Sequence, residues 1–206
     1  ASTKGFDVGS FIDLNGDLDS LAFNMQLSGT GASLATMKSN LEGTFRHLTF
    51  NNYSYDCIQT DIQFIKGLID GSLMIIDPNL SLNLTADADL SSELYQNAIR
   101  LELDKANLGK LNFSNTPLSL EGVLTTNLAT TNFKRFNGDF AIRNFKANNG
   151  IDTYKVDSLL VASIDQEGKT EISIDSDIME GKFEGNIDLF TVSDALLQHV
   201  DRYYKL

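Results

Sequence analysis

A run of eleven residues that alternate strictly between apolar and polar is the feature that most constrains the fold. From Leu80 to Leu90 the even positions are apolar and the odd positions are polar. Successive side chains of a β-strand point to opposite faces, so in a strand this pattern separates an apolar face from a polar one. A helix would spread the same polar residues around its whole surface. The run therefore predicts one long amphipathic strand, about 36 Å in length at roughly 3.3 Å per residue.

The chain also repeats itself. Residues 55–90 overlay residues 154–189 at a constant offset of 99 without a gap, which places Tyr55 on Tyr154. Upstream, residues 41–50 match residues 136–145 at an offset of 95. Apolar positions that persist between variable polar loops are typical of structural units that bury their faces against one another. We therefore expect two β repeats, residues 1–100 and residues 101–206, in one continuous sheet.

Shorter alternating runs and turn residues extend the all-β prediction over most of the chain. Alternation recurs over residues 6–14, 23–27, 99–104, 118–120, 140–142, 171–175 and 183–189. Turn-forming residues stand between these runs, at 15–17, 28–31, 77–79, 148–150 and 166–168. A short C-terminal helix is predicted from the apolar stripe that follows the capping residue Ser193, formed by Leu196, Leu197, Val200 and Tyr204. Residues 91–98 are a second candidate helix, and residues 34–41 are a candidate turn.

The apolar face of such a sheet has to be covered. Two sheets can pack as a sandwich, one sheet can close into a barrel, or one sheet can curl into a trough whose lining stays available to a ligand. The predicted inward set is mostly Leu, Ile, Ala and Phe, and it includes the small residues Ala86 and Ala88. Small side chains leave space if nothing opposes them, although a sandwich core can also use alanine. The fold class that we predict is a curled antiparallel sheet made from the two repeats.

Charge and cysteine content exclude several classes of function. The net charge is −12, and Lys and Arg do not cluster anywhere. Nucleic acids and anionic membrane surfaces attract proteins through several neighbouring cations, so neither is an expected partner. The single cysteine, Cys57, allows no internal disulfide and aligns with Val156. We interpret Cys57 as a small buried apolar residue.

Residues for metal binding or nucleophilic catalysis are sparse. His47 and His199 lie far apart, and no metal-ligand spacing, nucleophile elbow or phosphate-binding loop occurs. The cluster Asp13–Asp19 offers oxygen ligands at short spacing, but its glycine is misplaced for a calcium loop and Asn15-Gly16 is a strong hairpin signal.

Two pairs of carboxylates share a strand face, Asp87 with Asp89 and Asp175 with Asp177. Paired carboxylates can hydrolyse glycosides, but charges on a solvated outer face need no such role and discourage aggregation. We therefore expect a protein that is not an enzyme, with no catalytic residue, no metal site and no cofactor.

Several motifs carry a resemblance to a known family. They are Gly71 to Leu80 running into Ala88-Asp89-Leu90, Ala106 to Leu111, Tyr154 to Leu159, Ser176 to Gly185, and finally Leu196, Leu197 and the Tyr203-Tyr204 pair. In these residues the chain resembles an interior segment of a TamB-like protein, the translocation and assembly module component of the Gram-negative envelope, in its Bacteroidetes-type form. AsmA-like relatives share the same pattern, and the resemblance covers nearly the whole chain.

The resemblance implies a bridge between the inner and outer membranes, built from a curled "β-taco" sheet with a hydrophobic groove. It implies a role in phospholipid transport, outer-membrane assembly and protein secretion, with phospholipid acyl chains in the groove. It also implies a location in the periplasm, as a segment of an inner-membrane-anchored protein. An outer-membrane barrel protein would be a partner of the full-length chain. Because the sequence contains no apolar run near 18 residues, we expect a segment other than the anchored one.

Ten apolar residues are predicted to line the groove: Leu80, Leu82, Leu84, Leu101, Leu103, Ile172, Ile174, Phe183, Ile187 and Leu189. Full burial of a Leu or Ile is worth about 1.5–3 kcal/mol, so an open groove needs an occupant. The first alternative is a structural or adhesive β-repeat protein with a closed core. The second is a carbohydrate-binding β-domain, for which Tyr53, Tyr55 and Tyr154 are the available aromatic residues.

Overall fold

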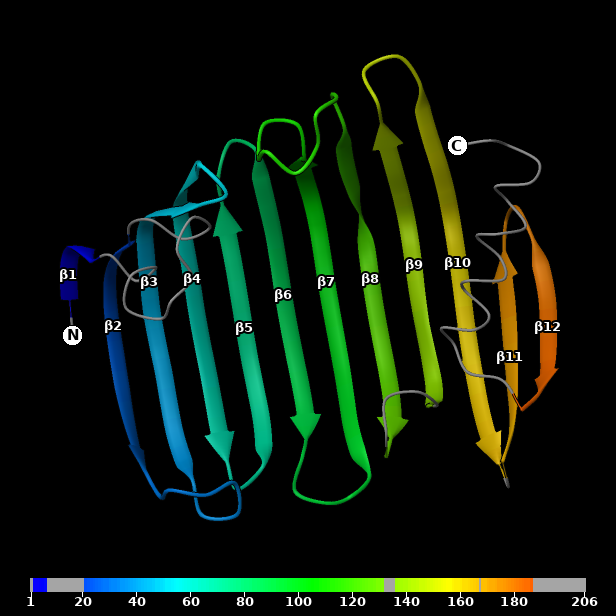
Figure 1. The fold of residues 1–206 in the computed structure, drawn as a ribbon, viewed down its shortest axis with the longest axis horizontal. Helices are drawn as coiled ribbons and strands as arrows, with labels where there is room; N and C mark the ends of the chain where they lie inside the picture. The colour runs from blue at the N-terminus through cyan, green and yellow to red at the C-terminus, as the bar shows by residue number, and fades with distance from the viewer. Residues whose placement is uncertain (1, 7–20, 132–135, 167, 187–206) are drawn as a thin grey trace.

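The computed structural model of the chain is a single antiparallel sheet of twelve strands, and the sheet is not closed (Figure 1). The structure describes residues 2–6, 21–131, 136–166 and 168–186. Each strand pairs with its neighbours in the chain, so the sheet order is the sequence order. The strands are β1 (Ser2–Phe6), β2 (Leu21–Thr30), β3 (Lys38–Phe50), β4 (Tyr53–Ile65), β5 (Leu68–Ile76), β6 (Leu80–Asp89), β7 (Tyr95–Asn107), β8 (Ser119–Thr130), β9 (Asn137–Asn148), β10 (Thr153–Gln166), β11 (Lys169–Ser176) and β12 (Glu180–Gly185).

The all-β prediction is confirmed for the described part of the chain. The long alternating run forms β6, and the runs at 99–104 and 171–175 lie within β7 and β11. The candidate helix at residues 91–98 is wrong, because β7 begins at Tyr95 and pairs with β8 from its first residue, Tyr95 opposite Thr130. Tyr95, Asn97 and Ile99 are half-buried and alternate with exposed residues, which is the period of a strand. The C-terminal helix, the run at 6–14 and the Asp13–Asp19 cluster lie outside the described residues.

Turn residues stand where the hairpins reverse. The predicted turn at Asp77-Pro78-Asn79 joins β5 to β6, and mutual backbone hydrogen bonds between Asp77 and Leu80 close it. Gly168, at φ +81°, lies between β10 and β11, where glycine is the residue that adopts this conformation without strain. The candidate turn at 34–41 is shorter than predicted: Thr36 and Met37 donate to the Ser33 carbonyl, and β3 begins at Lys38.

Irregularities in the strand pairing lie at the same height along several neighbouring strands of the sheet. The register shifts in β6–β7, β7–β8 and β8–β9, near Leu82, Leu103 and Gly122. At the same level one pair is missing from the otherwise regular register of β9–β10, at Asp157. Bulges bend strands and increase their twist, so we call this level the bend line. The ends of the β3–β4 and β9–β10 hairpins and the β7–β8 loop lie beyond it.

Strand registers recur along the sheet at the offset of 99. In β3–β4, Leu48 is opposite Tyr55, and in β9–β10, Ala147 is opposite Tyr154. The register of β2–β3 matches that of β8–β9 at the same offset. The register of β5–β6 likewise matches that of β11–β12: the pair Leu73–Leu84, for example, corresponds to Ile172–Phe183. The registers of β4–β5 and β10–β11 do not match at this offset. The pair next to the turn is Ile65–Leu68 in β4–β5, whereas in β10–β11 it is Gln166–Lys169, in which each residue lies two positions beyond the counterpart expected at the offset of 99. The predicted upstream offset of 95 differs from the offset of the strand pairing. The registers that involve β3 and β9 also match at 99.

Candidate functional site

Eight of the ten predicted groove residues lie on one face of the sheet, which we call the apolar face. Leu82 is opposite Leu103 and Leu84 is opposite Leu101 in β6–β7, and Leu80 shares their face of β6. Ile172 is opposite Phe183 in β11–β12, and Ile174 is opposite Val161 in β10. Ile187 and Leu189 lie outside the described residues. The register therefore brings the eight together on one surface, although they come from two distant parts of the sequence.

A continuous row of large aliphatic residues joins the two parts of this face. Successive cross-strand partners run from β5 to β10, and all are half-buried: Leu73, Leu84, Leu101, Leu124, Ile142 and Leu159. We call these six residues the central row. At about 4.8 Å between neighbouring strands, the row is roughly 24 Å long. Leu73, Leu124, Ile142 and Leu159 were not among the predicted residues, because their register could not be read without knowing the partners.

The two ends of the apolar face are covered, whereas its middle is not fully buried. At one end Tyr55, Ile58, Ile75 and Leu111 form a buried cluster, the first corner, against which Leu80 and Leu82 pack. At the other end Val161, Ile172 and Ile174 form a second cluster, against which Phe183 packs. Ile172 is completely buried and Ile174 is 8% exposed, so these two predicted groove residues are not accessible. Neither cluster includes Leu84, Leu101, Leu124 or Ile142.

No described strand forms a second layer over the middle of this face. The substantial contacts between the described strands all join lateral neighbours in the sheet.

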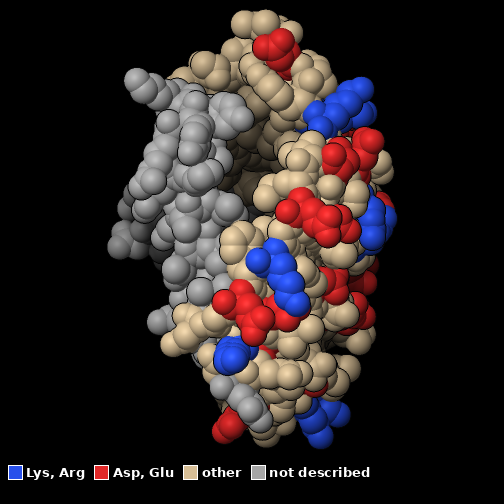
Figure 2. All heavy atoms as spheres, turned by 90° about the vertical axis from the view of Figure 1, so that its right-hand side faces the viewer, with Lys and Arg blue, Asp and Glu red and all other residues tan. Residues whose placement is uncertain are grey.

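The opposite face of the sheet is polar and charged. Along β5–β7 it presents Ser72, Thr85 and Arg100 in one row of cross-strand partners. Ion pairs on this face join Arg100 to Glu102, Lys146 to Glu121 and Lys182 to Glu171. Seen from the β12 edge, Lys, Arg, Asp and Glu side chains gather on one side of the sheet, the right-hand side of the view (Figure 2). These pairs are half exposed, so each contributes little to stability.

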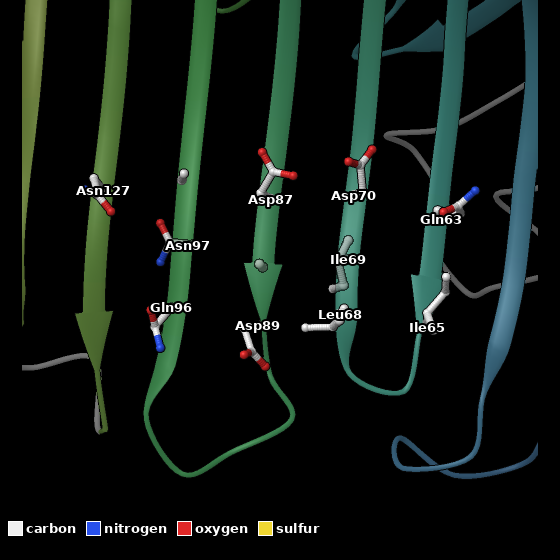
Figure 3. A pocket seen from close by; sticks show the side chains of 12 residues that line it. Gln63, Ile65, Leu68, Ile69, Asp70, Asp87, Asp89, Gln96, Asn97 and Asn127 are labelled. Carbon is white, nitrogen blue, oxygen red and sulfur yellow. The ribbon is translucent and has the colours of Figure 1, made fainter.

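A shallow depression of about 480 Å³ lies near the β4–β5 and β6–β7 turns (Figure 3). Its lining includes Asp70 opposite Asp87, together with Gln63, Gln96, Asn97 and Asn127. Most of these side chains belong to the polar face, and the depression therefore lies apart from the central row. Two carboxylates directly opposite each other repel when no cation lies between them. No group of His, Cys, Asp or Glu within the described residues has the arrangement of a metal site.

The buried carboxylate of Asp77 accepts hydrogen bonds beside the first corner, at the bend line. Asp77 is 7% exposed and accepts hydrogen bonds from the Tyr53 hydroxyl at 2.5 Å, from the Asp56 backbone N–H at 3.1 Å and from the Asn79 backbone N–H at 2.8 Å. Cys57–Ile76 is the last pair of the β4–β5 ladder, and the Asp77 side chain accepts from the next backbone N–H of β4, that of Asp56. Burial, and then the hydrogen bond to Asp77, raise the pKa of Tyr53. Burial also raises the pKa of Tyr55.

Asp177 has the matching role in the other half of the sheet. Its carboxylate accepts hydrogen bonds from the backbone N–H groups of Asp157 and Ser158, both at 3.3 Å. These bonds, that from Asp157 first, lower the pKa of Asp177. Asp177 is thus held by the backbone of β10, and its pairing with Asp175 for hydrolysis has no structural support. Cys57 is half-buried rather than buried, and Gln59 is the hydrogen-bond partner of its sulfur.

The arrangement can hold an apolar ligand by burial, because the apolar face carries aliphatic side chains and few polar groups. In the part of the chain that the structure describes, no helix is long and apolar enough to cross a membrane. No protein-family model matches the chain, and no match was found among curated proteins or among solved structures.

Proposed function

We propose that the chain is a non-enzymatic lipid-binding segment whose apolar face holds acyl chains over the central row. The observation that carries this proposal is the half-buried state of Leu84, Leu101, Leu124 and Ile142, over which no described strand packs. Completing the burial of large aliphatic side chains is favourable by up to about 1.5–3 kcal/mol each. An extended apolar ligand provides that burial without needing polar partners.

The roughly 24 Å length of the central row suits a long, flexible hydrocarbon chain lying across the strands. The hydrophobic effect has no directional requirement, so such a surface accepts acyl chains of different lengths. The headgroup would stay toward water. No residue transfers a proton or a phosphoryl group in this mechanism.

We also propose that the sheet consists of two units of six strands, β1–β6 and β7–β12. The matching registers of three strand pairs at the offset of 99 support this construction, and so does the shared role of Asp77 and Asp177. The junction between the units would then be the β6–β7 pairing, at about residue 95 rather than residue 100. Across this junction the apolar face is continuous, since Leu84 pairs with Leu101.

The cellular role is a further proposal, which the continuous apolar face supports. A continuous apolar path is what phospholipid movement between the inner and outer membranes requires. We propose that this chain is a TamB-like or AsmA-like periplasmic segment that serves phospholipid transport and outer-membrane assembly. An outer-membrane barrel protein would be a partner of the full-length protein.

Binding of a fluorescent fatty acid tests the lipid proposal. Leu84→Asp places a carboxylate in the middle of the central row and should reduce the affinity by at least about tenfold, because a charge cannot be buried against hydrocarbon without a partner. Asn83→Asp adds the same charge to the exposed polar face next to it and should leave the affinity unchanged. If the two variants bind alike, or if the unaltered chain binds no fatty acid, the apolar face does not have this function.

A closed-core structural protein is the remaining alternative, favoured by the two buried clusters at the ends of the face. It predicts that the folded chain binds no apolar probe. The same titration therefore separates the two functions.

A further inference from the structure

Two polar side chains lie together on the apolar face, beside the central row. The Thr126 hydroxyl donates a hydrogen bond to the Asn97 Oδ1 atom at 3.2 Å. Both residues belong to this face, because Asn97 is four residues before Leu101 on β7 and Thr126 is two residues after Leu124 on β8. They are diagonal neighbours on adjacent strands, where side chains are within reach of each other. We call them the polar pair.

The surroundings of the polar pair are apolar. Both members are half-buried. Their cross-strand partners on this face carry no polar side-chain atom: Ala88 and Leu128 beside Asn97, and Ile99 and Phe140 beside Thr126. A polar group that is covered by hydrocarbon costs free energy unless it has a hydrogen-bond partner. A ligand that lies over the middle of the face therefore has to satisfy the polar pair as well as the aliphatic side chains.

The hydrogen bond from Thr126 determines which atoms of the Asn97 amide remain available. It occupies Oδ1, so the Nδ2 group points the other way. An asparagine Nδ2 group carries two N–H donors. Within the described residues neither of these donors has an acceptor. The polar pair therefore presents hydrogen-bond donors without a formal charge.

We propose that the Asn97 amide binds the carbonyl oxygen at the head of an acyl chain, and that Thr126 positions this amide. The inference rests on the proposed lipid binding, because an acyl chain over the middle of the face would remove water from the Asn97 donors. Hydrocarbon has no acceptor for them, whereas a carboxylate or an ester carbonyl has one. An ammonium headgroup carries donors only and does not match.

The location of Asn97 suits a headgroup. Asn97 is the third residue of β7, close to the β6–β7 turn (Figure 3), so a group that is bound there can reach water. Along the strand, Asn97 is about 13 Å from Leu101 in the central row, at roughly 3.3 Å per residue. A chain whose carbonyl end is held at Asn97 can therefore run to the central row and continue over it.

Displacement of a bound fluorescent fatty acid tests this headgroup site. The competing ligands are dodecanoic acid, its methyl ester and dodecylamine, which share the chain and differ at the head. Asn97→Leu removes the donors and keeps a side chain of similar size. It should lower the affinity for the acid, relative to that for the amine, by about tenfold. The ratio of the two affinities cancels the effect of the added apolar area.

Matched variants separate the site from general effects of substitution. Asn127→Leu makes the same change on the exposed polar face of β8 and should leave the ratio unchanged. Thr126→Val removes the hydroxyl that orients the amide and should lower the ratio by about threefold, because the amide can then turn. Thr126→Ser keeps the hydroxyl and should restore the ratio. Circular dichroism verifies the fold of each variant.

The methyl ester identifies the source of the carbonyl oxygen. If Asn97→Leu weakens binding of the acid and the ester relative to the amine, a neutral ester carbonyl, as in a phospholipid, is sufficient. If it weakens only the acid, the site selects a free carboxylate. Both results support the inference. An unchanged ratio of acid to amine in the folded Asn97→Leu protein overturns it and leaves the proposed lipid binding intact. If the unaltered chain binds none of the ligands, the proposed function fails and the headgroup site with it.

Discussion

Tyr55 and Tyr154 occupy the same register position in their hairpins, yet Tyr55 is 5% exposed and Tyr154 is 57% exposed. The difference has a local cause, because the β7–β8 loop contributes Leu111 to the cluster around Tyr55. One sequence position can thus be core in one half of the sheet and surface in the other.

Replacing these two tyrosines should have very different costs. Tyr55→Ala removes a buried ring and should lower the free energy of unfolding by about 3 kcal/mol. Tyr154→Ala should change it by less than about 0.5 kcal/mol, since the ring is largely in water. Urea unfolding of both variants checks this expectation, and similar costs would contradict the burial described for the first corner.

The sequence predicts much of the sheet and little of the first corner. Strict alternation identifies β6, β7 and β11, because a strand with one apolar face has an apolar residue at every second position. Strands β3 and β4 are harder to recognise: apolar Phe45 and Leu48 both pack against the first corner although they stand three apart, which departs from a period of two. Leu111 gives no signal at all, since a single leucine in an Asn-rich loop has no periodicity. Its role depends on a contact with residues more than fifty positions away.

Asp77 should be important for stability because its carboxylate is buried and accepts hydrogen bonds from three donors at once. Asp77→Asn keeps the shape but replaces one acceptor oxygen by a donor. Oδ1 accepts from the Tyr53 hydroxyl and the Asn79 N–H, and Oδ2 accepts from the Asp56 N–H, so at least one of these donors would face the new amide N–H. We expect a loss of about 1–3 kcal/mol in the free energy of unfolding, measured by urea denaturation. Asp104→Asn changes an exposed carboxylate in β7 and is the matched control, with an expected effect near zero. Equal effects in the two variants would show that the Asp77 network does not stabilise the fold.

The hydrogen bonds to Asp177 predict a dependence of stability on acid pH. They lower the pKa of Asp177 in the folded chain, so its contribution is complete above the pKa of the unfolded chain. The contribution is lost as the pH falls through the lower folded pKa. Asp177→Asn should therefore flatten the stability profile in the acid range, relative to the unaltered chain. Unfolding curves measured between neutral and strongly acid pH check this, and parallel profiles for the two proteins would contradict it.

Gly138 should tolerate no side chain. Its φ is +129°, and a Cβ would collide with the Asn127 carbonyl oxygen on β8. Gly138→Ala should lower the free energy of unfolding by more than about 1 kcal/mol, because both the backbone and the neighbouring strand would have to move. At Gly71 a Cβ would meet the Ile62 side chain and the Asp61 carbonyl oxygen at ordinary contact distances, so Gly71→Ala should be nearly neutral. Thermal unfolding of the two variants compares them directly, and the opposite order would show that β8 and β9 approach each other differently.

Native mass spectrometry of the purified chain tests the lipid-binding account most directly. We expect the unaltered protein to carry phospholipid or fatty acid, the Asn83→Asp protein to carry the same amount, and the folded Leu84→Asp protein to carry little or none. An unaltered protein without lipid, or a Leu84→Asp protein with its full load, would contradict the proposal that the central row binds acyl chains.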